Sequence, residues 1–124
     1  MRLGESMEDY LEAILVLSEC LDHVRSVDVA SYLGFSKPSV SHAVKLLLQQ
    51  DLIHLDPNKF IELSEKGKLI AQETYHRHCF FKEMLENIGV PKDIASEDAC
   101  RMEHVVSNET FEAIQKYYKE KEAQ

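Results

Sequence analysis

Hydrophobic runs long enough to cross a membrane are missing from this 124-residue sequence, and cysteine is scarce. A transmembrane helix needs roughly 20 apolar residues, and the first ten residues, MRLGESMEDY, lack the charged and apolar regions of a signal peptide. We therefore expect a cytoplasmic protein with no membrane partner. The three cysteines are odd in number and lie in helix-like runs, so free thiols are expected rather than a disulfide framework: Cys20, Cys79 and Cys100.

An excess of positive charge is also missing, since the formal net charge is −8. Such a charge argues against a nucleic-acid partner. The charge is unevenly distributed, however, because the segment from Lys37 to Lys68 holds five lysines and four acids. Acidic clusters able to bind divalent cations contribute to the remaining negative charge, so metal binding would make the protein less repulsive to DNA.

Apolar residues recur at helical spacing near the start of the chain. Between Ser6 and Leu21 they follow a helical stripe, with acids on the other side: Met7, Leu11, Ile14, Leu15 and Val16. At 44% apolar residues the chain can bury a modest core, as one domain or two small ones. We find no internal repeat and expect a first amphipathic helix here.

Two short helices joined by a tight turn are predicted next. Ser26 is a candidate N-cap for a helix over Val27–Leu33, and Gly34 is the residue type that ends a helix in the left-handed conformation. Ser36 is the expected cap of the following helix, with Pro38 in its first turn, where the missing N–H costs nothing. Together they match the helix-turn-helix pattern.

The second of these helices, over residues 37–50, has one apolar and one polar face. Its expected buried stripe consists of Val40, Ala43, Val44 and Leu47. Its polar face and a lysine of the following hairpin supply the candidate contacts to double-stranded DNA: Ser36, Lys37, Pro38, Ser39, Ser41, His42, Lys45 and Lys59. The alternative is a winged helix that binds a protein and not DNA, since the same fold serves both purposes.

A β-hairpin is predicted after the helix-turn-helix. Residues 52–56 and 59–63 are β-compatible, and Asp56 and Pro57 suit the first two positions of a type I turn. This hairpin would be the wing of a winged helix.

Three further helices are expected in the second half of the chain. Ser64 is the candidate cap of a long helix over residues 66–88, which Gly89 ends. A shorter helix over 94–106 follows, and Ser107 is the candidate cap of a last one. The predicted fold class is mainly α with a small β-hairpin.

Potential metal ligands cluster at helical spacing near both ends of the chain. Cys100, Glu103 and His104 occupy positions i, i+3 and i+4, so a helix presents a thiolate, a carboxylate and an imidazole on one face. Asp9 and Glu12 form a second helix-spaced pair. Because the apolar faces of these helices must pack together, the carboxylates would be brought close, and a metal ion would resolve their repulsion.

Spacing alone leaves two questions open. His76 and His78 differ by about 200° around a helix, so only one of them can face a common site, and the pattern does not say which. The alternative to metal binding is that Cys100 is a small core residue, while Glu103 and His104 are solvated.

Several segments resemble one known family. SMEDYLEAI, FSKPSVSHAV, ELSEKGK, YHRH and EDACRMEHVVS are similar to the metal-dependent transcriptional repressors of the diphtheria-toxin-repressor and manganese-transport-regulator family. The likeness covers nearly the whole chain. It implies an N-terminal winged helix-turn-helix domain over residues 1–70 and a helical metal-binding and dimerisation domain over residues 71–124, in the form that lacks an SH3-like domain.

The resemblance also implies which residues bind metal, and it selects His78 over His76. The implied ligand set is Asp9, Glu12, His78, Cys100, Glu103 and His104. Two positions depart from the family patterns: Cys100 stands where manganese-type members have Glu, and Asp9 stands where iron-type members have Met. The iron-type ancillary site differs as well, since Lys82 and Ser96 stand where that group has Glu and His.

The mixed ligand set leaves the metal open between Mn²⁺ and Fe²⁺, with Co²⁺, Ni²⁺, Zn²⁺ or Cd²⁺ as substitutes in vitro. A thiolate favours the softer ions, whereas the carboxylates suit Mn²⁺. A binuclear site bridged by Glu103 is also compatible with six ligands.

The expected function is a homodimeric, metal-activated repressor of metal-uptake genes, acting on a palindromic DNA operator with no small-molecule substrate. Metal would tie the first helix to the dimer-forming helices and set the spacing of the recognition helices. The expected two-fold interface comprises Ile94, Met102, Val105, Val106, Phe111 and Ile114. One alternative is a metal hydrolase or oxygenase, which is disfavoured because six protein ligands on packed helices leave little room for the open coordination position that catalysis needs. The other is a metal-independent interaction module.

Overall fold

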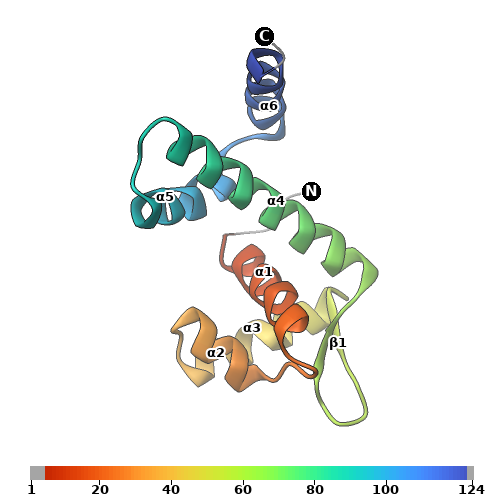
Figure 1. The fold of residues 1–124 in the computed structure, drawn as a ribbon. Coiled ribbons are helices and arrows are strands. Elements are labelled where there is room, and N and C mark those ends of the chain that lie inside the picture. The colour runs from red at the N-terminus through yellow and green to blue at the C-terminus, as the bar shows by residue number, and fades with distance from the viewer. Residues whose placement is uncertain (1–4, 123–124) are drawn as a thin grey trace. The chain divides into compact units, whose positions relative to one another are not determined.

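The protein is mainly helical, with one short hairpin, as the sequence predicts (Figure 1). The computed structural model describes residues 5–122. In chain order its elements are α1 (Glu5–Cys20), α2 (Ser26–Leu33), α3 (Lys37–Gln49), β1 (Ile53–Leu55), β2 (Ile61–Leu63), α4 (Glu65–Asn87), α5 (Lys92–Val105) and α6 (Asn108–Glu122). None of the helices in this part of the chain is both long and apolar enough to cross a membrane.

The chain forms two compact units that meet within α4, between Arg77 and His78. The first unit, residues 1–77, contains α1 to α3, the hairpin and the first half of α4. The second unit, residues 78–124, contains the rest of α4 with α5 and α6. The domain boundary predicted after residue 70 stays a prediction.

The core of the first unit contains most of the predicted apolar residues, although Val16 of α1 is only half-buried. Leu11 and Ile14 of α1 are buried, and α1 packs on α2, α3 and β2. The whole predicted stripe of α3 is buried as well: Val40, Ala43, Val44 and Leu47. Burial of this stripe leaves the opposite face of α3 in solvent.

Helix ends follow the predicted capping residues with one exception. The Ser36 hydroxyl accepts a hydrogen bond from the Ser39 N–H at 3.3 Å, and Gly34 is left-handed at φ 72°. The prediction that Ser26 caps a helix over Val27–Leu33 is wrong by one residue, because α2 already begins at Ser26. The cap is Arg25, whose backbone N–H donates to the Asp28 carboxylate at 2.9 Å.

The hairpin has the predicted position and a compact turn. Its strands are antiparallel, with His54 opposite Glu62. The Asp56 carbonyl accepts from the Lys59 N–H at 2.9 Å, and the Asp56 carboxylate accepts from the Asn58 and Phe60 N–H groups. Lys59 adopts a left-handed φ of 66° at the end of this turn.

Close backbone contact joins the hairpin to the start of α4. A Cβ added at Gly67 would lie 1.9 Å from the Leu52 carbonyl oxygen, so only glycine fits there. The predicted cap Ser64 accepts from the Gly67 N–H at 3.0 Å and donates to the Asp51 carbonyl at 2.7 Å. The wing and α4 are therefore held together by main-chain packing.

A smaller core lies in the second unit. Phe81 of α4, Ala99 of α5 and Phe111 of α6 are buried together. The Phe81 and Phe111 ring centroids lie 5.5 Å apart. As predicted, α6 is capped by Ser107, whose hydroxyl accepts from the Thr110 N–H at 3.1 Å.

Candidate metal centre and DNA-binding surface

The second unit brings three of the predicted ligands together. His78 comes from α4, whereas Cys100 and Glu103 come from one face of α5. One potential ligand atom of each side chain, a nitrogen, a sulfur and an oxygen, lies within 4.8 Å of the other two. Ligands of one divalent ion are separated by at most about 4.5 Å, because metal–ligand distances are about 2.0–2.3 Å. The spacing is therefore close to that of a metal site.

Glu103 is the centre of this group. Its side chain is fully buried, and its two oxygens contact two imidazoles: His78 Nδ1 at 3.0 Å and His104 Nε2 at 3.2 Å. A buried carboxylate is costly unless positive charge balances it. The imidazoles supply that charge only when protonated, whereas a divalent ion would supply it beside neutral imidazoles. The donor set thus fits a metal ion.

The structure also distinguishes the two histidines that spacing leaves open. His78 is half-buried and contacts Glu103, whereas His76 is exposed. Cys100 is exposed too. Its exposure contradicts the alternative in which Cys100 is a core residue.

The first-helix candidates lie in the other unit. Asp9 and Glu12 are both half-buried on α1. Glu8 was not predicted as a buried residue, since the acids of this helix were assigned to its solvent side, yet it is only 3% exposed. Its spacing from Leu11 and Leu15, three and seven residues on, is the signal that could have found it.

Arg77 and Thr74 of α4 are two further buried polar residues that the sequence analysis missed. With Ile70 and Phe81 they lie at positions i, i+4, i+7 and i+11 of one helix. This is the spacing of a buried face. An arginine and a threonine were not read as core residues because of their polarity.

All eight candidate DNA contacts are exposed. Ser36 is the N-cap of α3, six others lie on α3 itself, and Lys59 lies at the hairpin turn. The exposed set is Ser36, Lys37, Pro38, Ser39, Ser41, His42, Lys45 and Lys59. In proteins that bind DNA through a helix-turn-helix, the exposed face of the second helix is the one that enters the major groove.

The candidate dimer residues divide into two groups. Phe111 is 6% exposed and belongs to the core of its own unit, with Met102, Val106 and Ile114 partly buried around it. Ile94 and Val105 are 46% and 76% exposed. Only the second group offers apolar surface that the protomer itself leaves largely uncovered.

Two family models match almost the whole chain. Residues 2–61 match the N-terminal DNA-binding domain of the iron-dependent repressors. Residues 64–123 match the metal-binding and dimerisation domain of the same repressors.

Known regulators are similar over most of this chain. The transcriptional regulator MntR of Escherichia coli O157:H7 is 38% identical over 110 residues, which are 89% of this chain and 71% of that protein. An uncharacterised helix-turn-helix regulator of Methanocaldococcus jannaschii is 32% identical over 114 residues, covering 90% of this chain and 91% of its own length.

Solved structures of two regulators are similar in fold to this chain. The manganese regulator SloR superposes with a TM-score of 0.83 at 32% identity, covering 96% of this chain and 55% of that one. A manganese-dependent transcriptional repressor in complex with manganese gives a TM-score of 0.80 at 26% identity, covering 90% of this chain and 51% of its own. The chain thus spans about half the length of these solved regulators.

Proposed function

This chain belongs to the iron-dependent repressor family, and on that premise we propose that it is a metal-activated, DNA-binding repressor of metal-uptake genes. The family and its relatives are transcriptional regulators, not enzymes, which argues against a hydrolase or oxygenase. The partner is a double-stranded, palindromic operator, bound by a homodimer without a small-molecule substrate.

The observation that carries this proposal is the grouping of His78 and Cys100 with the fully buried carboxylate of Glu103. These residues would hold the ion, with His104 beside them on α5. When bound, the metal supplies positive charge at Glu103 and links the elements that carry its ligands. The protein's own contribution is to fix the three donors in place before binding.

The metal we propose is Mn²⁺ or Fe²⁺, with Co²⁺, Ni²⁺, Zn²⁺ or Cd²⁺ as substitutes in vitro. The Cys100 thiolate favours softer ions, whereas the carboxylates suit Mn²⁺. Affinity alone follows Mn²⁺ below Fe²⁺ below Zn²⁺, so selectivity in the cell must come from geometry and metal supply.

Asp9 and Glu12 complete the ligand set in our proposal, on the strength of the family resemblance. Binding would then order the DNA-reading helices of a dimer about 34 Å apart, one turn of DNA, so that both enter successive major grooves. A coupling of about 1 to 3 kcal/mol is usual for such a linkage, which changes operator affinity at least several-fold.

The matched pair His78→Ala and His76→Ala tests the site. Both remove an imidazole from α4, but His78 contacts the buried Glu103, whereas His76 is exposed. Co²⁺ binding can be measured from the thiolate-to-metal absorption band. We expect His78→Ala to weaken this binding at least tenfold and His76→Ala to leave it unchanged. Equal effects of the two variants on Co²⁺ affinity would contradict a metal site at His78.

Cys100→Glu tests the role of the thiolate. Binding isotherms under anaerobic conditions with Mn²⁺ and Fe²⁺ should show a shift of preference towards Mn²⁺ in the variant, since a hard oxygen replaces sulfur. Unchanged preference would mean that Cys100 does not set the selectivity.

A further inference from the structure

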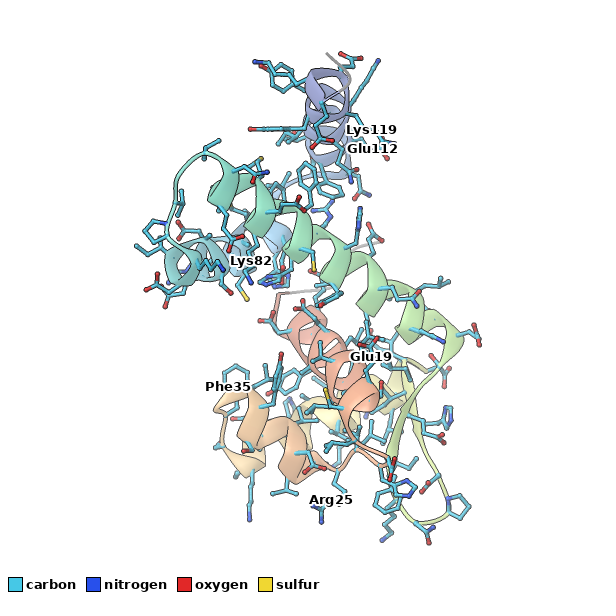
Figure 2. The ribbon with its side chains drawn as sticks, in the orientation of Figure 1. Glu19, Arg25, Phe35, Lys82, Glu112 and Lys119 are labelled. Atoms are coloured by element: carbon cyan, nitrogen blue, oxygen red, sulfur yellow. The ribbon has the colours of Figure 1, made fainter. Side chains whose placement is uncertain are left out.

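Phe35 is a large apolar residue that the proposed function does not use. It lies in the turn between α2 and α3, directly before the N-cap Ser36, and Figure 2 labels it there. Its side chain is 44% exposed. A phenylalanine in this position exposes apolar surface in the free protein, whereas its neighbours on the α3 side are polar.

The local structure holds Phe35 in one place. Gly34 turns the chain with its left-handed φ of 72°, and the Phe35 N–H donates to the Ala30 carbonyl at 3.1 Å. The ring packs edge-to-face on Tyr10 of α1, with 5.8 Å between the centroids and a 62° angle between the planes. Phe35 is therefore a fixed feature of the surface.

Phe35 shares a groove with residues already assigned to DNA. The groove has a volume of about 620 Å³, and its lining includes Phe35, Tyr10, Ser36, Ser39 and His42. Ser36, Ser39 and His42 are three of the candidate DNA contacts, so a ligand that reaches them also meets the phenylalanine ring.

The major groove of DNA has one apolar group among the base edges, the C5-methyl of thymine, and Phe is among the side chains that contact it. Residues at the start of a recognition helix are the ones that touch base edges. Resting on the proposed function, we propose that Phe35 reads a thymine methyl in each operator half-site. Phe35 then determines specificity, while the lysines mainly contact phosphates.

The experiment removes the methyl group and nothing else from the DNA. A duplex is selected from a random library by the full-length, Mn²⁺-loaded protein, and each thymine is then replaced singly by deoxyuridine. At one position of a half-site the replacement should weaken binding about fourfold, the value expected for one buried methyl group. Other thymines should tolerate it.

Three variants connect this effect to Phe35. Phe35→Ala should bind the thymine and uracil duplexes equally, whereas Phe35→Leu, which keeps an apolar side chain, should retain most of the difference. The control is Tyr32→Ala, which removes an exposed aromatic ring from α2, and it should retain the full fourfold effect. Thermal unfolding of each variant checks that the fold survives.

Two results would overturn the proposal. One is a Phe35→Ala variant that still distinguishes thymine from uracil; the other is a wild-type protein that never does so. Both differ from a failure of the proposed function, in which the metal-loaded protein would select no duplex.

Discussion

Among single residues, Glu103 is the centre of the metal site that we propose. Its carboxylate is completely buried between two imidazoles, an arrangement whose charge balance depends on protons or on a metal ion. Removing the negative charge while keeping the shape should therefore change the response to metal more than the fold.

Glu103→Gln tests this dependence. Mn²⁺ at one hundred times its dissociation constant should stabilise the wild-type protein by about 2.7 kcal/mol, because the ion binds the folded state. The variant should show almost none of this gain in thermal unfolding. Glu97→Gln, an exposed change on the same helix, is the control and should keep the gain; an undiminished gain in Glu103→Gln would contradict the role of Glu103.

Gly67 and Gly34 make a second comparison between single residues. Gly67→Ala should lower the free energy of unfolding by about 2 kcal/mol or more, because the new Cβ overlaps the Leu52 carbonyl. Gly34→Ala should cost only about 1 kcal/mol, the cost of a left-handed alanine with open space around it. Urea denaturation measures both, and a smaller loss for Gly67→Ala would refute the close contact.

The sequence pattern predicted which residues of α5 come together at the site, but it did not predict which polar side chains are buried. The spacing of Cys100, Glu103 and His104 follows from helix geometry, so it could be predicted. Whether His76 or His78 joins them depends on the rotation of α4 against α5, which is a tertiary property. The burial of Glu8 and Arg77 was not predicted, because charged residues were expected in solvent even where their spacing matched that of buried neighbours.

At the scale of elements, helix ends were predictable because caps are local. Ser36, Ser64 and Ser107 each accept a backbone hydrogen bond three residues on. The start of α2 was not predicted, since its cap comes from the Asp28 carboxylate reaching back to Arg25. Serine is a commoner N-cap residue than arginine, so the sequence favoured Ser26, which is in fact the first residue of the helix.

Ser64 and Ser107 should differ in what they contribute to stability. Ser107→Ala removes one cap hydrogen bond and should cost about 1 kcal/mol. Ser64→Ala also removes the bond to the Asp51 carbonyl and should cost more, about 2 kcal/mol. Chemical denaturation of both variants checks the order, and equal losses would mean that the second bond adds nothing.

At the scale of the whole molecule, the second unit must serve both as a folded core and as a dimerisation surface. Sequence alone grouped Phe111 and Val105 together, because both are apolar. The structure separates them, since Phe111 is buried and Val105 is 76% exposed. We therefore expect the two residues to affect different equilibria.

Phe111→Ala should lower the free energy of unfolding by about 3 to 5 kcal/mol, the usual cost of removing a buried phenylalanine. Val105→Asp should leave thermal unfolding of the protomer nearly unchanged and shift the protein towards monomer in analytical ultracentrifugation. If the Val105→Asp protein dimerises like the wild type, Val105 does not belong to the dimer interface.

If metal controls DNA binding, as we propose, the affinity for DNA must differ with and without metal. The selected duplex is titrated with full-length protein under anaerobic conditions in Mn²⁺, in Fe²⁺ and in chelator. We expect binding at least about fivefold tighter with one of the metals than with chelator, and no such gain for Glu103→Gln. Equal affinity in metal and in chelator would contradict it.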